Sequence, residues 1–229
     1  MKPRGRRSPV TQEDRDVAHF DQWAPDYDRD PLQQRFFGPV HTQTMALVAG
    51  LEVRPRRVLD IGCGTGALLR LLARQFPGTA LAGVDAAAGM ARMARQAGVR
   101  AGVVQASAGA LPFGDANFDL VISTVSFHHW ASQRAGLAGV RRVLALGGIF
   151  LLADLHAVGY LRVFYTLARR RDRMHTRREL TGMLAEARLD VQEWAPVFDL
   201  DPLLPLRHRP PRPPTGRVPL VTAVIARAV

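Results

Sequence analysis

The feature that most constrains the fold of this chain is the run Val58–Gly66, VLDIGCGTG. In this run an apolar strand ends in a carboxylate and turns through three alternating glycines toward a helix. Glycine lets the backbone adopt positive φ and approach a ligand closely, and the free N–H groups of a helix N-terminus favour a negative group. In an open α/β sheet such a turn lies at the carboxyl edge, where ligands bind. The run therefore predicts an α/β protein with a ligand site at this turn.

Short apolar runs alternate with helical patterns along the chain beyond this turn. Strand, helix and strand at this spacing predict right-handed crossovers and a mostly parallel sheet with helices on both faces. Thr176 followed by Glu179 is a capping box and predicts the start of a further helix. The expected strands are Arg57–Ile61, Ala80–Val84, Ala101–Gln105, Phe118–Thr124, Gly148–Asp154, Val191–Phe198 and Val218–Ala228, and the expected helices are Gly66–Gln75, Ala87–Gln96, Ser132–Leu146 and Thr176–Leu189.

The N-terminal part divides into a tail and a cap. Residues 1–12 are basic and contain two prolines, which predicts a disordered tail. Over residues 13–52 the apolar side chains fall at helical spacing, interrupted at Pro25 and Pro31, which predicts a helical cap of two helices that break there. Residues 53–229 form the expected ligand-binding domain, and the whole is a single globular domain. Eight of the sixteen prolines lie between 196 and 219, where an extended loop is expected.

Composition excludes several classes of protein. The single cysteine, Cys63, excludes a disulfide scaffold and a cysteine-built metal site. No run of about 20 apolar residues could span a membrane, and the basic N-terminus lacks the apolar stretch of a signal peptide, so we expect a cytoplasmic protein without integral membrane association. The net charge is +11, yet 30 of the 31 basic residues are arginine and only Lys2 is lysine. So uniform a bias indicates the base composition of the coding sequence and not selection for binding phosphate groups. No nucleic-acid partner is therefore expected.

A second carboxylate, Asp85, closes the next expected strand. At this place a carboxylate can accept hydrogen bonds from both hydroxyls of a ribose; the alternative is a cap for the following helix. Two cofactor classes compete for the glycine turn. Gly62, Gly64 and Ala67 satisfy the dinucleotide fingerprint, which keeps an NAD-dependent oxidoreductase open. Asp60 argues against it, because a negative charge before the turn suits an ammonium or sulfonium ligand better than a pyrophosphate.

Five segments, taken in order, resemble the class I S-adenosylmethionine-dependent methyltransferases, most closely those of ubiquinone and menaquinone biosynthesis. The resemblance implies a Rossmann-like three-layer sandwich whose seven-stranded, mostly parallel sheet has the order 3-2-1-4-5-7-6. It also implies an enzyme that uses S-adenosyl-L-methionine to methylate a small-molecule acceptor on oxygen, nitrogen or carbon. The segments are Val58–Gly66, Gly83–Asp85, Val104–Gly114, Asn117–Ser123 and Arg141–Asp154.

The resemblance further implies a set of cofactor-binding residues. Asp60 and the three glycines would surround the methionyl part, Asp85 would hold the ribose, and Tyr27 of the cap would close over the methionyl end. Where Ser107 stands, the family usually carries an acidic residue that bonds the adenine amino group; this departure keeps a cofactor-binding protein without turnover as an alternative. The implied residues are Tyr27, Asp60, Gly62, Gly64, Gly66, Asp85, Ala86, Met90, Ser107, Ala108 and Ser123.

Two adjacent histidines, His128 and His129, follow the fourth expected strand. Because histidine accepts a proton near neutral pH, both are candidate general bases. The alternative is that the pair begins the next helix, with one ring in solvent and the other bonded to backbone. In an extended segment their side chains would point to opposite sides, so that at most one would face the transferred methyl. No metal site is expected, since no Asp, Glu or third His accompanies the pair at ligand spacing. The arginine cluster at 169–178 is interpreted as a solvated face, and the alternatives are a site for an acidic substrate, a membrane surface or RNA.

Overall fold

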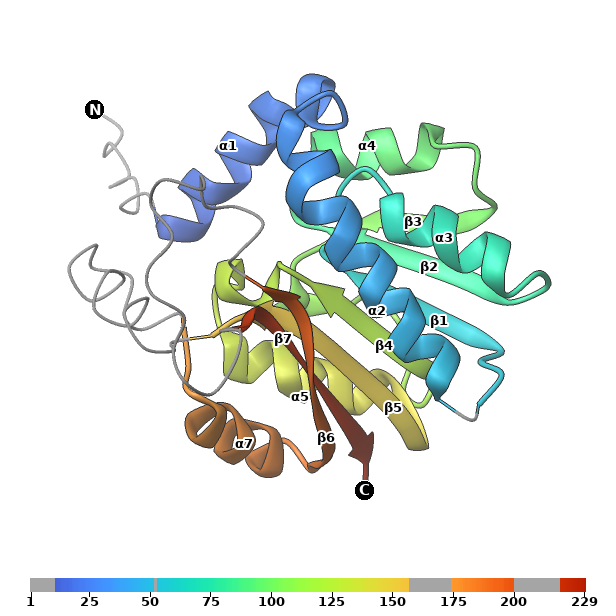
Figure 1. Cartoon of the computed structure of the whole chain (residues 1–229), viewed down its shortest axis with the longest axis vertical. Helices are drawn as coiled ribbons and strands as arrows, with labels where there is room; N and C mark the ends of the chain where they lie inside the picture. Colours follow the sequence, from blue (N-terminus) through green and yellow to red (C-terminus); the bar gives the residue numbers. More distant parts are fainter. Residues whose placement is uncertain (1–10, 52, 157–173, 200–218) are drawn as a thin grey trace, which may run out of the picture.

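The computed structural model of this protein describes residues 11–51, 53–156, 174–199 and 219–229. Seven strands form one sheet in the order β3-β2-β1-β4-β5-β7-β6 (Figure 1), which confirms the predicted order. The first five strands pair in parallel, and β7 lies antiparallel between β5 and β6. The strands are β1 (Arg57–Ile61), β2 (Ala80–Asp85), β3 (Ala101–Gln105), β4 (Phe118–Thr124), β5 (Leu144–Leu155), β6 (Leu189–Asp199) and β7 (Pro219–Ala228).

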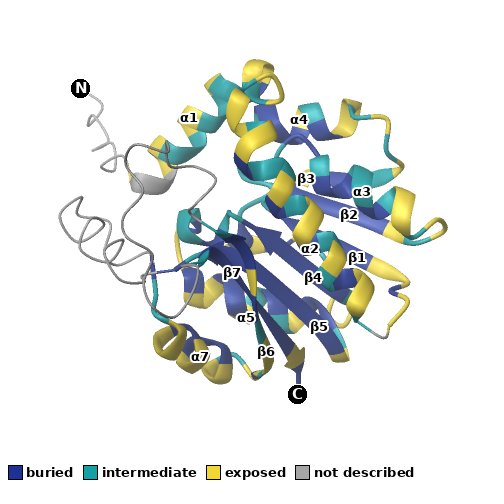
Figure 2. Ribbon diagram, viewed as in Figure 1, coloured by how far each residue is buried: buried dark blue, intermediate teal, exposed yellow. Residues whose placement is uncertain are grey.

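Helices cover both faces of the sheet and bury two apolar cores. On one face α2 and α3 pack against alternate strand residues such as Val58, and on the other α5 and α7 pack against the intervening ones such as Leu59. This division follows from the period of two in a strand. The central strands are buried on both faces (Figure 2). The helices are α2 (Gly38–Gly50), α3 (Ala67–Gln75), α4 (Ala88–Gln96), α5 (Gln133–Val143) and α7 (Arg177–Glu186), with short 3₁₀ turns η2 (Ala108–Ala110) and η3 (Phe127–His129).

The N-terminal cap consists of α1 (Gln12–Tyr27), the π-helical turn η1 (Gln33–Phe37) and α2. A capping box between Thr11 and Asp14 fixes the start of α1, slightly earlier than the predicted cap. The predicted break at Pro25 is wrong, because α1 continues through it to Tyr27. Pro25 lies in the last turn, two residues before the helix ends.

Several further boundaries differ from the prediction. Leu189, expected to end a helix, begins β6, and α7 ends at Glu186. The helix expected to run to Leu146 ends at Val143, and Leu144 already belongs to β5. Apolar residues at 143 and 144 suit the buried face of either element, so the pattern could not place the transition. The proline-rich loop expected from residue 196 begins later, because Pro196 lies in β6. As β6 is an edge strand, it tolerates a residue that lacks an N–H.

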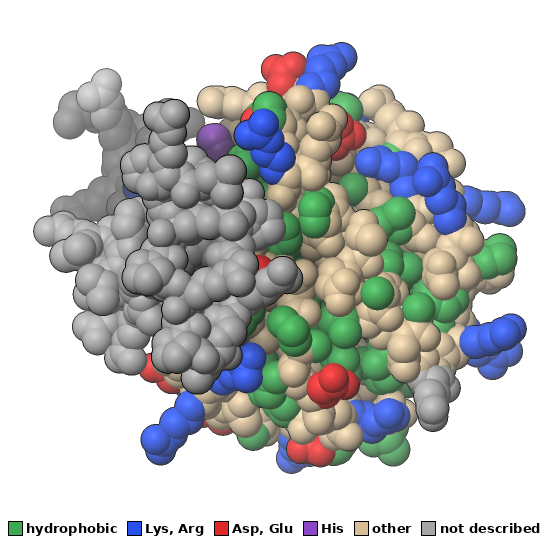
Figure 3. Space-filling model, in the orientation of Figure 1, with side chains coloured by type: hydrophobic (Ala, Val, Ile, Leu, Met, Phe, Trp, Pro, Cys, Tyr) green, Lys and Arg blue, Asp and Glu red, His purple; other side chains and the backbone are tan. Residues whose placement is uncertain are grey.

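Several expected features fall outside the described residues: most of the basic tail, the arginines from 169 to 173, and most of the proline-rich loop. None of the described helices is long and apolar enough to cross a membrane. On the face shown in Figure 3, the basic side chains of the described residues are spread around the rim instead of gathering in one patch.

Candidate active site

A cavity lies over the carboxyl ends of β1, β2 and β4, at the glycine turn. The strands contribute backbone and polar side chains at its floor, while α1 and η1 of the cap provide aromatic rings on the opposite side, and α2 provides His41. It is lined by Asp16, Val17, Phe20, Tyr27, Phe37, His41, Asp60, Ile61, Gly62, Cys63, Gly64, Thr65, Ala67, Asp85, Ala86, Ala87, Met90, Ala106, Ala108, Thr124, Val125, Ser126, His129 and Trp130.

The glycine turn takes the left-handed conformation that its sequence predicts. The φ angles of Gly62, Gly64 and Gly66 are +74°, +53° and +82°, a region that other residues rarely adopt. The N–H groups of Gly62 and Cys63 both donate to the carbonyl of Val84, at 2.8 and 3.0 Å, which ties the turn to β2. A Cβ on Gly64 would meet no atom within 4 Å, so this backbone faces open space in the cavity.

Nine of the predicted site residues line this cavity. Four do not: Gly66, Ser107, Ser123 and His128. A Cβ on Gly66 would make an ordinary van der Waals contact with Ala94, at 3.4 Å, so it is the positive φ of this residue that favours glycine. The nine are Tyr27, Asp60, Gly62, Gly64, Asp85, Ala86, Met90, Ala108 and His129.

Ser123 and Ser107 do not line the cavity, although their sequence neighbours do. Successive side chains of an extended backbone alternate in direction. At the end of β4 it is Thr124 that lines the cavity, while Ser123 is fully buried in the sheet. Ser107 likewise stands between Ala106 and Ala108, both of which line it. The predicted adenine contact through Ser107 therefore has no support in this arrangement.

Asp60 is a buried carboxylate at the end of β1. Its Oδ1 has no hydrogen-bond partner among the described residues, and only 1% of the residue is exposed. Burial, with a smaller contribution from the charge of Asp85, raises the pKa of Asp60 to about 8. An unsatisfied buried carboxyl group that lines a cavity is a strong site for a cation, because a positive ligand would both pair with it and favour its ionised form.

Asp85 at the end of β2 accepts two backbone hydrogen bonds. Its Oδ2 receives the N–H of Gly64 and its Oδ1 that of Ala87, both at 2.9 Å. Burial raises its pKa, and the two amide bonds oppose this rise. Asp85 thus couples the glycine turn to the start of α4 and presents its carboxylate to the cavity. Asp85 can therefore cap the following helix and also accept hydrogen bonds from a ribose, since each carboxylate oxygen has a further lone pair.

Three carboxylates of the cap tie it to the rim of the cavity. Asp16 accepts a bond from the Nδ1 of His129 at 3.0 Å, Asp21 from the amide of Gly89 at 2.6 Å, and Asp28 from the hydroxyl of Thr65 at 2.6 Å. Apolar packing of α1 on α4 supports these bonds. The cap therefore forms a wall of the cavity and is not an independent unit.

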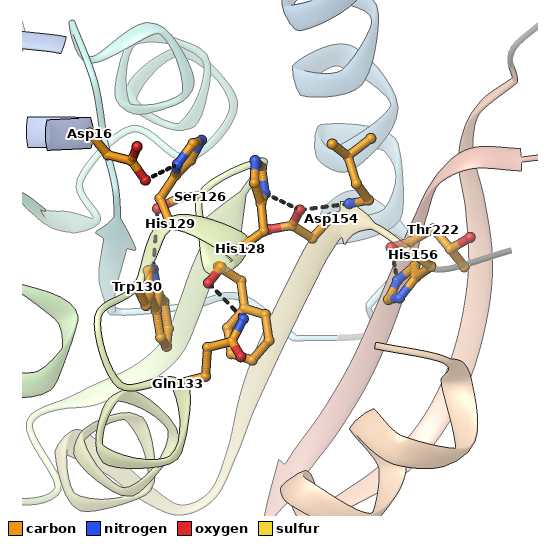
Figure 4. Close-up of polar contacts among 11 residues, drawn as sticks. Asp16, Ser126, His128, His129, Trp130, Gln133, Asp154, His156 and Thr222 are labelled. Atoms are coloured by element: carbon orange, nitrogen blue, oxygen red, sulfur yellow. Dashed lines mark hydrogen bonds and ion pairs between the residues drawn. The ribbon is translucent and has the colours of Figure 1, made fainter. Parts of the chain in front are cut away.

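The two histidines stand side by side on the 3₁₀ turn η3 (Figure 4). Their ring centroids are only 4.1 Å apart, so the prediction that they point to opposite sides is wrong. The tight turn, not an extended segment, sets their directions. His129 bonds to Asp16, whereas His128 donates from Nδ1 to Oδ1 of Asp154, at 2.6 Å. This second bond draws His128 away from the glycine turn and into a neighbouring pocket.

Sequence patterns missed several residues of the cavity. His41 lies in α2 among apolar residues of the cap, and burial lowers its pKa to about 4, so that its ring is uncharged at neutral pH. Ser126 accepts a bond from the indole N–H of Trp130, at 3.2 Å, and this pair forms the edge of the cavity next to η3. No local pattern marks these residues, because they meet only through tertiary packing.

The charge of the cavity is its most informative property. Its described lining includes Asp16, Asp60 and Asp85 and contains neither lysine nor arginine. The two lining histidines are uncharged at neutral pH, since burial also lowers the pKa of His129 to about 4. Such a cavity attracts a cation and repels a pyrophosphate.

Comparison with known proteins agrees with this chemistry. The family model described as a methyltransferase domain matches residues 59–152. The malonyl-[acyl-carrier protein] O-methyltransferase of Geobacter sulfurreducens is 38% identical over 197 residues, which are 80% of this chain and 71% of that protein. This chain belongs to the class I S-adenosylmethionine-dependent methyltransferases. The demethylmenaquinone methyltransferase of Thermus thermophilus is 35% identical over 139 residues, 59% of this methyltransferase and 63% of the relative.

A solved structure supports the fold of this methyltransferase. A methyltransferase of Haloferax volcanii, determined in complex with the Trm112 methyltransferase activator, superimposes with a TM-score of 0.71 over 91% of this chain and 97% of its own, at 23% identity. The family model and the relative from Geobacter sulfurreducens confirm the family resemblance seen in the sequence, so the alternative of an NAD-dependent oxidoreductase is wrong. The glycine turn, shared by both classes, could not separate them; the acidic lining does.

Proposed function

We propose that this methyltransferase binds S-adenosyl-L-methionine in the cavity at the glycine turn and transfers the methyl group to a small-molecule acceptor. The observation that carries the proposal is the buried carboxyl group of Asp60, whose Oδ1 has no hydrogen-bond partner among the described residues, in a cavity whose described lining has no lysine or arginine. The ligand carries two positive groups, a sulfonium and an ammonium, and a cavity of this charge complements both.

The residues present fit the ammonium, the ribose and the adenine of this ligand. Asp60 pairs with the ammonium of the methionyl end, and Asp85 accepts hydrogen bonds from the ribose hydroxyls. The open space in front of Gly64 receives the ligand where a side chain would block it. Ala86, Met90 and Ala108 supply the apolar surface that an adenine ring requires. Tyr27, whose pKa is raised to about 12 by burial, remains a neutral hydroxyl on the cap side.

The chemistry divides between alignment and proton transfer. When bound, the cofactor supplies a methyl group whose leaving group departs as a neutral thioether, while the acceptor contributes the electron pair of the new bond. The protein holds the acceptor in line, which can be worth roughly 7–11 kcal/mol. His128 and His129 are the residues placed to receive a proton from the acceptor. With a pKa of about 4, His129 holds a proton poorly at neutral pH and is suited to orient the acceptor.

Binding and turnover test the proposal separately. We expect S-adenosylhomocysteine to bind with micromolar-range affinity, on the order of −8 kcal/mol, and NADH not to compete with it in calorimetric titration. Transfer of labelled methyl groups to acceptors would then exclude a binding protein without turnover. Tight NADH binding at the same site would contradict the proposal.

Asp85→Asn is expected to lower the affinity for S-adenosylhomocysteine at least tenfold. The change removes the charge and one acceptor oxygen, and a charged hydrogen bond contributes roughly 1.5–3 kcal/mol. Asp119→Asn is a matched control, since Asp119 also accepts two backbone N–H groups, those of Arg56 and Arg57, at 2.9 and 2.8 Å. It does not line the cavity, so its loss should affect stability alone. Equal effects of both variants on the dissociation constant would show that Asp85 is only a structural cap.

Three further expectations from the sequence stay predictions. These are a cytoplasmic location, the lack of a nucleic-acid partner, and the division into a tail of residues 1–12, a cap of residues 13–52 and a cofactor-binding domain of residues 53–229. Cell fractionation, nucleic-acid retention and limited proteolysis would test them in turn.

A further inference from the structure

A second pocket adjoins the cofactor cavity on its cap side, and we call it the annex. The two share Phe20, Tyr27, Phe37, Val125 and His129, so they meet at one wall. A molecule in the annex would therefore lie next to a ligand in the cavity without occupying the same space. This is the arrangement that transfer of a group between two bound molecules requires.

The annex is strongly apolar and aromatic. Trp23, Tyr27 and Phe37 form a chain of rings, with centroids 4.7 and 5.6 Å apart and tilted to one another. Its described lining includes no acidic or basic side chain other than two histidines. Aromatic surface of this kind favours a flat or extended apolar ligand, and burying a carboxylate there without a cation would be costly.

One of the two histidines that line the annex, His128, is held by a buried carboxylate. His128 lines the annex and not the cofactor cavity. Its Nδ1 donates to Asp154, whose side chain is 2% exposed. Burial alone would raise the pKa of Asp154, but the interaction with His128 and the backbone bond from Leu155 lower it overall, so the carboxyl group is ionised. An ionised partner keeps the proton on Nδ1, places the lone pair on Nε2 and stabilises the imidazolium once formed.

We propose that the annex binds a neutral, apolar methyl acceptor that bears an acidic hydroxyl, a phenol or an enol, and that His128 takes up its proton. The assignment rests on the proposed function and adds the acceptor class to it. The O–H bond breaks and its proton passes to Nε2 of His128. The oxygen electron pair forms the bond to the methyl carbon, and the electrons of the carbon–sulfur bond remain on sulfur. Asp154 is a positioning residue, since it acts through His128.

Two probes of the same shape test the acceptor class. In the presence of saturating S-adenosylhomocysteine, 2-naphthol should bind the full-length protein at least tenfold more tightly than 2-naphthoic acid, as measured by calorimetry at neutral pH.

Leu32 lines the annex, not the cofactor cavity, and is 44% exposed, so Leu32→Glu should fold. This variant should weaken 2-naphthol binding at least fivefold and leave S-adenosylhomocysteine binding unchanged. Equal or tighter binding of the acid, or an unaffected variant, would overturn the assignment.

Methyl transfer to 2-naphthol tests the role of His128. His128→Gln should reduce the rate by roughly 10²-fold or more without changing the dissociation constant of S-adenosylhomocysteine, and the loss should shrink at high pH, where the hydroxyl ionises unaided. Asp154→Asn should likewise reduce the rate, and this loss should also shrink at high pH. Failure to methylate bound 2-naphthol, or a variant that keeps the wild-type pH profile, would refute the proposal. Failure of S-adenosylhomocysteine itself to bind would instead refute the proposed function.

Discussion

Asp60→Asn is expected to weaken S-adenosylhomocysteine binding by about 100-fold or more and, at the same time, to stabilise the free protein. Removing one partner of a buried ion pair costs roughly 3–5 kcal/mol, which the ammonium of the ligand would lose here. The variant keeps the size and shape of the side chain, so the cavity itself should persist. Calorimetric titration of both proteins under the same conditions measures the loss.

The stabilisation follows from the direction of the pKa shift. The pKa of Asp60 is raised from 3.8 to about 8 in the folded protein, so the folded state holds a proton that the unfolded state releases above pH 4. The free energy of unfolding of the wild type therefore falls as the pH rises from about 4 to 8, and then levels off. Asparagine does not titrate, so the variant should gain stability over this range, by on the order of several kcal/mol at pH 8.

Denaturant titrations at pH 5, 7 and 9 check this second effect. The variant is expected to gain stability but lose affinity, and this difference is the internal control. A variant that merely misfolds would lose both stability and affinity. A variant that binds S-adenosylhomocysteine as tightly as the wild type would show that the ammonium is held elsewhere.

Gly62→Ala is expected to lower the free energy of unfolding by roughly 2–5 kcal/mol. This is the cost of holding alanine at positive φ together with the cost of overpacking. A Cβ there would lie 2.0 Å from the Oγ of Ser126. Displacing Ser126 would also disturb its bond with Trp130, and with it the turn that carries the histidines.

Gly64→Ala is the matched variant, with positive φ but open space in front of it. It should cost only about 1–2 kcal/mol of stability and should instead reduce cofactor affinity at least tenfold, because its methyl group enters the ligand space. Thermal unfolding with and without S-adenosylhomocysteine distinguishes the two outcomes. Equal losses of stability in both variants would contradict the described geometry of the turn.

The sheet was predictable because its signals are local. The central strands are short apolar runs, of which β1, β2 and β5 end near a glycine or a carboxylate. The order of the strands followed from the family resemblance and is confirmed. Errors arose where one local pattern suits two elements. Leu144 satisfies both the apolar face of α5 and the start of β5, and Pro25 is tolerated in the last turn of α1.

The site was predictable only where backbone geometry dictates it. The residues that the sequence singled out at the glycine turn and at the ends of β1 and β2 line the floor of the cavity, apart from Gly66. Asp16 and Asp154 reach their histidines across 113 and 26 residues of sequence, and no local periodicity encodes such pairs. The annex likewise gathers rings from the cap beside β4 and β7, so only the folded chain reveals it.

Proton release on ligand binding tests most directly the claim that Asp60 receives the ammonium of the cofactor. The pKa of this residue is about 8 in the free protein, so at pH 7 it is mostly protonated, and pairing with the ammonium should ionise it. Calorimetric titration of S-adenosylhomocysteine into the wild-type protein, in two buffers of different ionisation enthalpy, should show release of about one proton for each ligand bound. Asp60→Asn should release none. A binding enthalpy of the wild type that is the same in both buffers would contradict the account.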